Sequence, residues 1–286
     1  MLTSFFNRIK SAWGPPRRAN LCYHAAFASR FLPDRHDIIV YVPPQYRRTR
    51  ERRFPVLYMH DGQNLFDPKT AFGGMDWRVD ATADALISTG EIEPLIIVGI
   101  YNSGERRIDE YTPSRDPKRG GGRADLYGRM LVEEVIPFVM TEYRTLPDAA
   151  STALGGSSLG GLVSLYLGLQ YPHIFGKLAV LSPSVWWDDR RILDFIPGDV
   201  PEPRTKVWLD IGTQEGQMTL QDARAARDAL VRKGWKLGRD LHYQEIEGGT
   251  HNEAAWAARV GPVLKYLFPM QPKSETRQEL KTVEAR

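Results

Sequence analysis

Short apolar runs alternate with amphipathic stretches along most of the chain. The runs at 36–44, 54–62 and 93–102 are rich in β-branched or aromatic residues and end in turn formers, a pattern typical of strands. Residues 151–158 predict a buried strand. The almost entirely apolar stretch 160–171, which follows directly, predicts a buried helix.

The second half of the chain continues this alternation. Three further strands are predicted at 176–184, 206–213 and 240–249. The apolar periodicity of 123–143 predicts a helix that Pro137 kinks or divides. Residues 219–234 predict an amphipathic helix that ends at a glycine, and residues 254–268 predict one last helix.

Continuous apolar strands between helices predict an α/β fold with a mostly parallel central sheet and helices on both faces. No helix is expected between the early strands, so the N-terminal edge of the sheet is expected to be antiparallel. Residues 20–268 contain no repeat or linker and are expected to form one domain. Apolar residues at helical spacing predict a short helix in the N-terminal extension 1–19. The polar tail 269–286 is expected to be flexible.

Composition narrows the class of protein. The chain has 286 residues, of which 42% are apolar and 26% charged, as in ordinary globular proteins. The net charge of +3 is too small to indicate a nucleic-acid partner. No run approaches the roughly 18 apolar residues of a membrane span. The start of the chain is a poor secretory signal, and the single cysteine, Cys22, is expected to be buried or inert. We therefore expect a cytoplasmic protein.

A candidate nucleophile lies between the buried strand and the buried helix. Residues 156–160 read Gly-Ser-Ser-Leu-Gly, which is G-x-S-x-G with Ser158 at its centre. A serine at a sharp strand-to-helix turn exposes its hydroxyl, and the flanking glycines let strand and helix approach closely. The helix N-terminus also favours a negatively charged intermediate. A structural glycine turn is the alternative.

A nucleophilic serine needs a base, and the base needs an orienting acid. His251 follows a predicted strand on a loop that opens a helix, whereas His242 lies within a strand pattern, so His251 is the candidate base. Glu215, in the loop after 206–213, is the favoured acid. Asp210, inside that strand, and Asp222, on the next helix, are the alternatives.

The reaction also needs donors for the oxyanion. One is the backbone N–H of Leu159, the residue after the nucleophile. The other should come from the loop after an earlier strand. The segment HDGQN supplies such a loop, in which Gly62 allows close backbone approach and Gln63 offers its N–H.

Eight motifs, in order, resemble a known family: YVPPQY, PVLYMHDGQNLFD, IIVGIYN, EYTP, GGSSLGG, LSPSVWW, DIGTQEG and GGTHNEAAW. Together they are similar to the esterase-D-like group of α/β-hydrolases over roughly residues 20–268. That group includes enterochelin-type esterases, feruloyl and acetyl-xylan esterases, S-formylglutathione hydrolase and mycolyltransferases. The resemblance implies an α/β-hydrolase fold. It is specific for the superfamily and not for the substrate.

The resemblance also implies residue roles. Ser158 matches the family nucleophile, His251 the base, Glu215 the position of the acid and Gln63 the second oxyanion donor. Relatives often carry aspartate as the acid, so Glu215 departs from the common pattern. Four residues are candidates for substrate binding: Trp186, Trp187, Asn64 and Arg107. The two tryptophans are expected to form an aromatic wall, and Arg107 is expected to bind an anionic or catecholate group.

These observations predict a serine carboxylic-ester hydrolase that acts on a small-molecule ester. Siderophore esters come first among the substrates, with feruloyl or acetyl esters close behind. An acyltransferase with the same triad and a non-catalytic binding protein are the alternatives. No metal or other cofactor is expected, since the sequence has no HExxH motif, no paired cysteines and no G-x-G-x-x-G after a strand.

Overall fold

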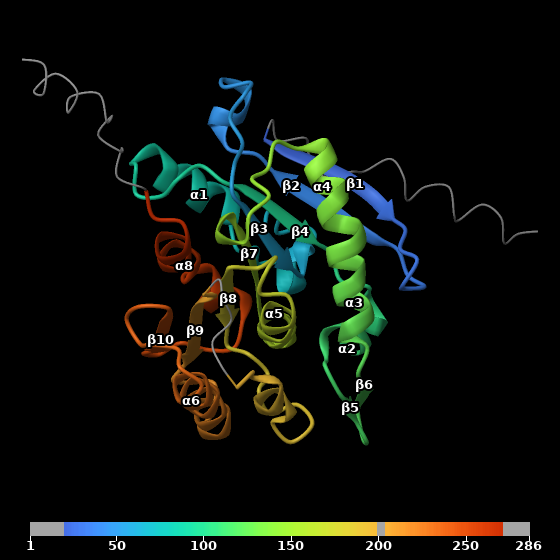
Figure 1. Ribbon diagram of the computed structural model, residues 1–286, viewed down its shortest axis with the longest axis vertical. Coiled ribbons are helices and arrows are strands. Elements are labelled where there is room, and N and C mark those ends of the chain that lie inside the picture. The colour runs from blue at the N-terminus through green and yellow to red at the C-terminus, as the bar shows by residue number, and fades with distance from the viewer. Residues whose placement is uncertain (1–19, 199–203, 271–286) are drawn as a thin grey trace, which may run out of the picture.

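A computed structural model describes residues 20–198 and 204–270 (Figure 1). The expected N-terminal extension 1–19 lies outside these ranges, as does the expected tail beyond residue 270.

Within the described residues, eight strands form one sheet in the order β1-β2-β4-β3-β7-β8-β9-β10. These strands are β1 (Leu21–Phe27), β2 (His36–Tyr41), β3 (Val56–His60), β4 (Ile96–Ile100), β7 (Thr152–Ser157), β8 (Lys177–Leu181), β9 (Lys206–Gly212) and β10 (Leu241–Ile246). A two-stranded sheet pairs β5 (Arg115–Asp116) with β6 (Gly120–Gly121). Strand β2 is antiparallel to β1 and β4, and all other neighbours in the large sheet are parallel. The prediction of a mostly parallel sheet with an antiparallel N-terminal edge is confirmed.

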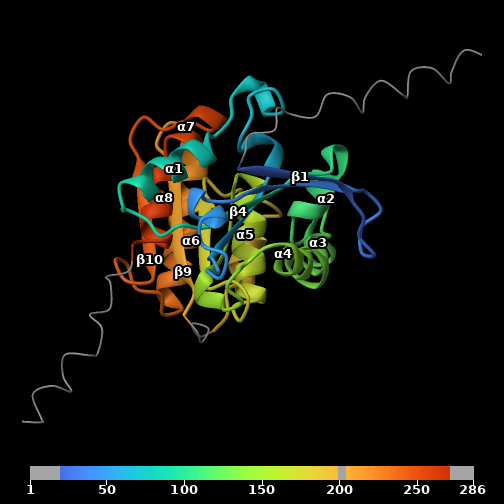
Figure 2. The same cartoon turned by 90° about the horizontal axis from the view of Figure 1, so that it is seen from above.

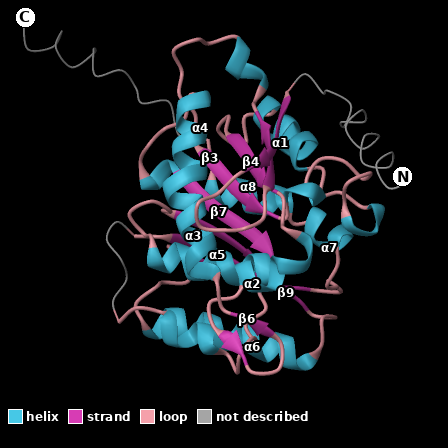
Figure 3. Ribbon diagram, turned by 90° about the vertical axis from the view of Figure 1, so that its right-hand side faces the viewer, coloured by secondary structure: helices cyan, strands magenta, loops and turns pink. Residues whose placement is uncertain are grey.

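Helices cover both faces of the sheet (Figures 2 and 3). They are α1 (Val79–Ser88), α2 (Arg107–Tyr111), α3 (Ala124–Met130), α4 (Ile136–Glu142), α5 (Leu159–Gln170), α6 (Gln217–Arg232), α7 (Glu253–Ala257) and α8 (Val260–Leu267). Figure 2 shows α1, α7 and α8 together on one side and α3 and α4 on the other. Alternate strand residues follow this division: Tyr58 packs in the core layer with α3 to α6, whereas Leu57 packs in the layer with α1 and α8.

Several elements were not predicted from the sequence, among them α1 and β1. Helix α1 connects the parallel neighbours β3 and β4, so the expectation of no helix between the early strands is wrong there. Strand β1 forms the edge of the sheet and is largely exposed, so it lacks a continuous apolar run. Cys22 was expected to be buried or inert; it lies on β1 and is exposed, so the expectation of burial is wrong.

Prolines divide two predicted helices. The helix expected at 123–143 is α3 and α4, joined by a π-helical turn at Leu131–Val135, with Pro137 in the first turn of α4. The helix expected at 254–268 is α7 and α8. Pro262 has no N–H to donate to the carbonyl of Ala258, so a continuous helix would lose a hydrogen bond at this point.

Candidate active site

Ser158 occupies a tight turn between the central strand β7 and helix α5. Strand β7 ends at Ser157 and α5 begins at Leu159. Ser158 has φ 58° and ψ −122°, a conformation that side-chain-bearing residues rarely adopt. Its N–H donates to the carbonyl of Leu181 (3.1 Å), and its carbonyl accepts from the N–H of Leu162 (3.0 Å). Because strained residues of this kind cluster at functional sites, the turn is a candidate for catalysis.

The flanking glycines are required by space. A Cβ atom on Gly156 would lie 3.0 Å from the carbonyl carbon of Gly160, and one on Gly161 would lie 2.8 Å from the carbonyl oxygen of Leu181. A larger residue at either position would therefore force the strand and the helix apart.

The structure brings Ser158, His251 and Glu215 into one hydrogen-bonded line. Ser158 Oγ lies 3.0 Å from His251 Nε2, and His251 Nδ1 lies 2.6 Å from Glu215 Oε2. All three follow carboxyl ends of parallel strands, namely β7, β10 and β9. With Nδ1 donating to the carboxylate, Nε2 is free to accept the serine proton.

Glu215 is held from several directions. Its side chain is fully buried, and Oε1 accepts from Ser182 Oγ (2.6 Å), from the Gly212 N–H (2.8 Å) and from Arg259 Nη2 (3.3 Å). Burial alone would raise the pKa of Glu215, but the hydrogen bonds from His251, Ser182 and Gly212 outweigh it and lower this pKa. Glu215 is therefore ionised when it faces the imidazole.

The alternative acids are engaged elsewhere. Asp210 is buried and accepts from Arg259 Nη1 (2.8 Å), and Asp222 accepts from Arg190 Nε (2.6 Å). His242 stacks on Trp208 with ring centroids 4.1 Å apart. Within the described residues, Asp210, Asp222 and His242 make no hydrogen bond to Ser158 or His251.

Arg259 is expected to be essential for stability, because it neutralises the buried Asp210 and also contacts Glu215. Substitution Arg259→Met should lower the free energy of unfolding by about 3–5 kcal/mol, as measured by urea denaturation. The double variant Arg259→Met/Asp210→Asn should recover part of the loss. The control Arg224→Met removes an arginine from a solvent-exposed pair and should have little effect. Equal effects of the two arginine variants would contradict this role.

The two expected oxyanion donors lie at the same end of the sheet. Within the described residues, neither the Leu159 N–H nor the Gln63 N–H has a hydrogen-bond acceptor. Gln63 belongs to the short 3₁₀ turn Gly62–Asn64 after β3. A Cβ on Gly62 would lie 2.6 Å from the carbonyl carbon of Gly99, so only glycine lets this turn pack against β4.

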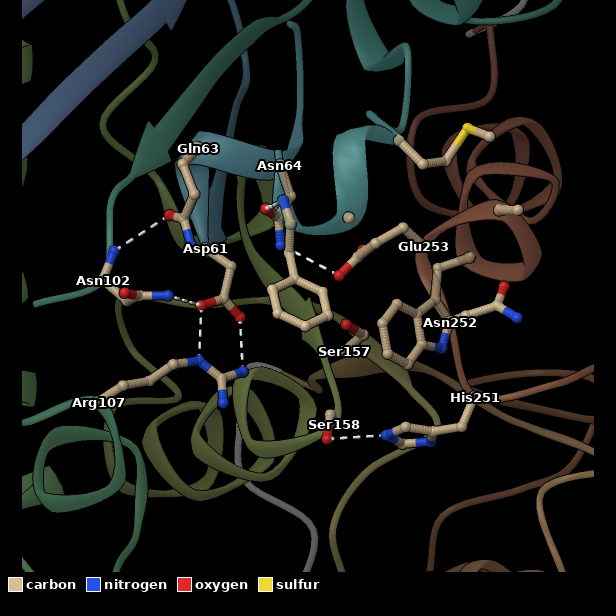
Figure 4. A pocket seen from close by; sticks show the side chains of 15 residues that line it. Asp61, Gln63, Asn64, Asn102, Arg107, Ser157, Ser158, His251, Asn252 and Glu253 are labelled. Atoms are coloured by element: carbon tan, nitrogen blue, oxygen red, sulfur yellow. Dashed lines mark hydrogen bonds and ion pairs between the residues drawn. The ribbon is translucent and has the colours of Figure 1, made fainter. Parts of the chain in front are cut away.

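A pocket of about 590 Å³ opens above Ser158 and His251 (Figure 4). Besides Ser158 and His251, its polar lining includes Asp61, Gln63, Asn64, Asn102, Arg107 and Glu253. Its apolar lining includes Phe72, Met75, Ala254 and Trp256. Figure 4 shows Arg107, Asp61 and Asn102 on one side of Ser158, with His251, Asn252 and Glu253 on the other.

Two of the four predicted substrate-binding residues line this pocket. The Asn64 Nδ2 group donates to Glu253 Oε1 (3.2 Å). Arg107 makes a bidentate ion pair with Asp61, at 2.7 and 2.8 Å. Burial raises the pKa of Asp61, but the charge and hydrogen bonds of Arg107, together with the hydrogen bond from Asn102, outweigh it and lower this pKa, so the pair is charged.

The expected aromatic wall is not part of the pocket. Trp187 is buried, and its indole N–H donates to the carbonyl of Ser114 (2.8 Å), as a core residue does. Trp186 is 39% exposed and lies under the guanidinium of Arg119. The motif SPSVWW could not reveal this, because the surroundings of the two side chains are set by contacts with distant residues, Ser114 and Arg119.

Sequence reasoning missed the residues that shape the pocket. Phe72 is 78% exposed at the pocket rim and precedes two glycines with positive φ. That signal, an aromatic residue at a glycine turn, could have been found. Glu253 belongs to the GGTHNEAAW motif, but its position in the pocket depends on a contact with Asn64, which is distant in the sequence.

Two further findings concern only the described residues. No group of three or more His, Cys, Asp or Glu side chains there could hold a metal ion. In the same part of the chain, no helix is long and apolar enough to cross a membrane.

Several known proteins are similar to this chain in sequence. YjcH of Bacillus subtilis is 27% identical over 247 residues, covering 85% of this chain and 95% of YjcH. The endo-1,4-beta-xylanase/feruloyl esterase of Xylanibacter ruminicola is 24% identical, over 80% of this chain and 29% of that protein. The iron(III) enterobactin esterase of Escherichia coli O6:H1 is 29% identical, over 43% of this chain and 31% of that protein. The chain thus spans less than a third of these two esterases.

Solved structures share the fold. BES protein from Bacillus cereus superimposes with a TM-score of 0.71 at 21% identity, covering 90% of this chain and 97% of BES. Siderophore hydrolase EstB from Aspergillus nidulans superimposes with a TM-score of 0.68 at 20% identity, covering 91% of this chain and 99% of EstB. The model of the family described as "Putative esterase" matches residues 29–267. The chain therefore belongs to this esterase family and is a carboxylic ester hydrolase.

Proposed function

We propose that the chain hydrolyses small-molecule carboxylic esters through an acyl-enzyme on Ser158. The observation that carries this proposal is the continuous line of hydrogen bonds from Ser158 Oγ through His251 to Glu215. The strained turn at Ser158 presents the hydroxyl to the pocket, and the buried carboxylate fixes the imidazole tautomer.

The proposed reaction has two halves. Ser158 Oγ attacks the ester carbonyl while His251 Nε2 takes its proton, and the N–H groups of Leu159 and Gln63 stabilise the oxyanion. The tetrahedral intermediate then collapses, and His251 gives the proton to the departing alcohol. Water repeats the sequence on the acyl-enzyme, which releases the acid and restores Ser158. Glu215 stabilises the imidazolium in both halves.

The pocket favours an ester with a bulky apolar or aromatic part. Phe72, Met75 and Trp256 contribute aromatic and apolar surface to the lining. The names of relatives suggest feruloyl and siderophore esters as the classes to examine first.

A cytoplasmic location remains our proposal, and the exposed free thiol of Cys22 is consistent with a reducing compartment.

Phe72 is expected to contribute to binding of such groups. Substitution Phe72→Ala should raise KM for methyl ferulate or 4-nitrophenyl octanoate by about fivefold, since part of an aromatic contact is lost. The KM for 4-nitrophenyl acetate should hardly change, because the acetyl group is too short to reach the rim. Leu237→Ala, which removes a 56% exposed side chain outside the pocket, is the control. A uniform change across all three esters would contradict this role.

The proposed function is tested by a panel of esters. Purified protein would be assayed with 4-nitrophenyl esters from acetate to dodecanoate, methyl ferulate and a catecholate trilactone. We expect turnover of several esters, with the fastest among those that carry an apolar or aromatic group. Folded protein that hydrolyses none of them would contradict the proposal.

A further inference from the structure

The charged groups of the pocket do not balance. Four lining residues can carry charge: Asp61, Arg107, His251 and Glu253. The bidentate pair of Arg107 with Asp61 cancels one positive and one negative charge. Because His251 must be neutral to act as the base, Glu253 is left as the unbalanced charge of the pocket.

Glu253 has the contacts of an ionised carboxylate. Oε1 accepts from Asn64 Nδ2 (3.2 Å), and Oε2 accepts from the indole N–H of Trp77. The amide orientation of Asn64 is fixed, because its Oδ1 accepts from the Phe72 N–H (2.9 Å). Both oxygens of Glu253 therefore face donors, and neither needs to carry a proton. Burial raises the pKa of Glu253 above its usual value, and the hydrogen bond from Trp77 opposes this rise without cancelling it.

The carboxylate is held rigidly beside the reacting groups. Glu253 is the first residue of α7 and follows His251 by two positions, so the same short segment places both. Figure 4 shows its side chain turned toward Asn64 across the upper part of the pocket. Behind His251, the buried group of Asp210, Glu215 and Arg259 has two negative charges and one positive charge. This group adds to the negative field at the pocket.

We propose that Glu253 makes the pocket selective for uncharged esters and against esters that carry a negative charge near the scissile bond. A fixed carboxylate in a partly desolvated pocket repels an anion strongly, whereas it leaves a neutral group almost unaffected. The inference rests on the proposed function and specifies its substrate class. It favours neutral aromatic esters, such as feruloyl esters, over iron-loaded catecholates, whose phenolate oxygens are anionic.

The test compares three esters that share one chain length and one leaving group. They are phenyl hexanoate, which is neutral, the monophenyl ester of adipic acid, which is anionic, and phenyl 6-(trimethylammonio)hexanoate, which is cationic. Release of phenol gives kcat/KM for each. We expect wild type to use the anionic ester at least about tenfold less well than the neutral one. The cationic ester should be used at least as well as the neutral one.

Two variants locate the effect. Glu253→Gln should bring the ratio of neutral to anionic kcat/KM close to one, and Glu253→Asp should keep most of it. The control Glu247→Gln makes the same charge change at an exposed residue outside the pocket and should keep the wild-type ratio.

Each outcome has one meaning. An anionic ester used as well as the neutral ester by wild type would overturn the inference without any variant. An unchanged ratio in folded Glu253→Gln, or an equal shift in Glu247→Gln, would also overturn it. Failure of wild type to hydrolyse all three esters would instead count against the proposed function.

Discussion

Replacing Ser158 by alanine is expected to reduce kcat/KM for ester hydrolysis by at least about 10⁴-fold. The variant loses the atom that attacks the carbonyl. The neighbouring Ser184 hydroxyl lies 3.3 Å from Ser158 Oγ, but it is Ser158 Oγ that lies 3.0 Å from His251 Nε2. Alanine is smaller than serine, so the turn between β7 and α5 should keep its shape. The measurement is kcat/KM with the best ester of the panel, together with the thermal midpoint of unfolding.

A matched serine variant separates chemistry from packing. Ser164 lies on α5, is buried, and donates to the carbonyl of Gly160 (2.7 Å) without facing the pocket. Ser164→Ala should therefore retain most of the activity. Turnover by Ser158→Ala at a level near wild type would refute the assignment of the nucleophile.

Substitution Glu215→Gln is expected to lower kcat by about 10³–10⁴-fold with a small change in KM. The amide is nearly isosteric, but it cannot stabilise the imidazolium, and its NH₂ group can force His251 into the wrong tautomer. The effect should therefore appear in kcat, because the substrate pocket is unchanged.

Asp222→Asn is the control for this prediction. It makes the same carboxylate-to-amide change at one of the two alternative acids, which pairs with Arg190 in the structure. Asp222→Asn should keep kcat within about threefold of wild type, since it touches none of the reacting groups. The reverse order of the two variants would assign the acid to Asp222.

Strands with both faces buried were predictable from the sequence. Strands β7 and β9 consist almost entirely of buried residues. Ser158 follows β7 directly, and Glu215 lies three positions after the end of β9. Since parallel strands carry their sites at their carboxyl ends, the motif order alone indicated that Ser158, Glu215 and His251 could meet. The distances between them required the three-dimensional structure.

The pocket walls were much harder to predict. Trp187 and Phe72 are both aromatic residues near glycine-rich or proline-containing turns, yet one is buried and the other is 78% exposed. Local sequence does not encode which way such a turn directs its side chain. Contacts between residues far apart in the sequence could not be predicted either. Glu253 contacts Asn64, which is 189 positions away, and Arg259 contacts Asp210, which is 49 positions away.

Labelling with a fluorophosphonate tests the central claim most directly, because the probe reacts only with a serine that its neighbours have activated. Intact-mass and peptide analysis should find one adduct, on Ser158, and labelling should be abolished in Ser158→Ala and strongly slowed in His251→Ala. An adduct on another residue, or equal labelling of folded wild type and Ser158→Ala, would contradict the proposal that Ser158 is the nucleophile.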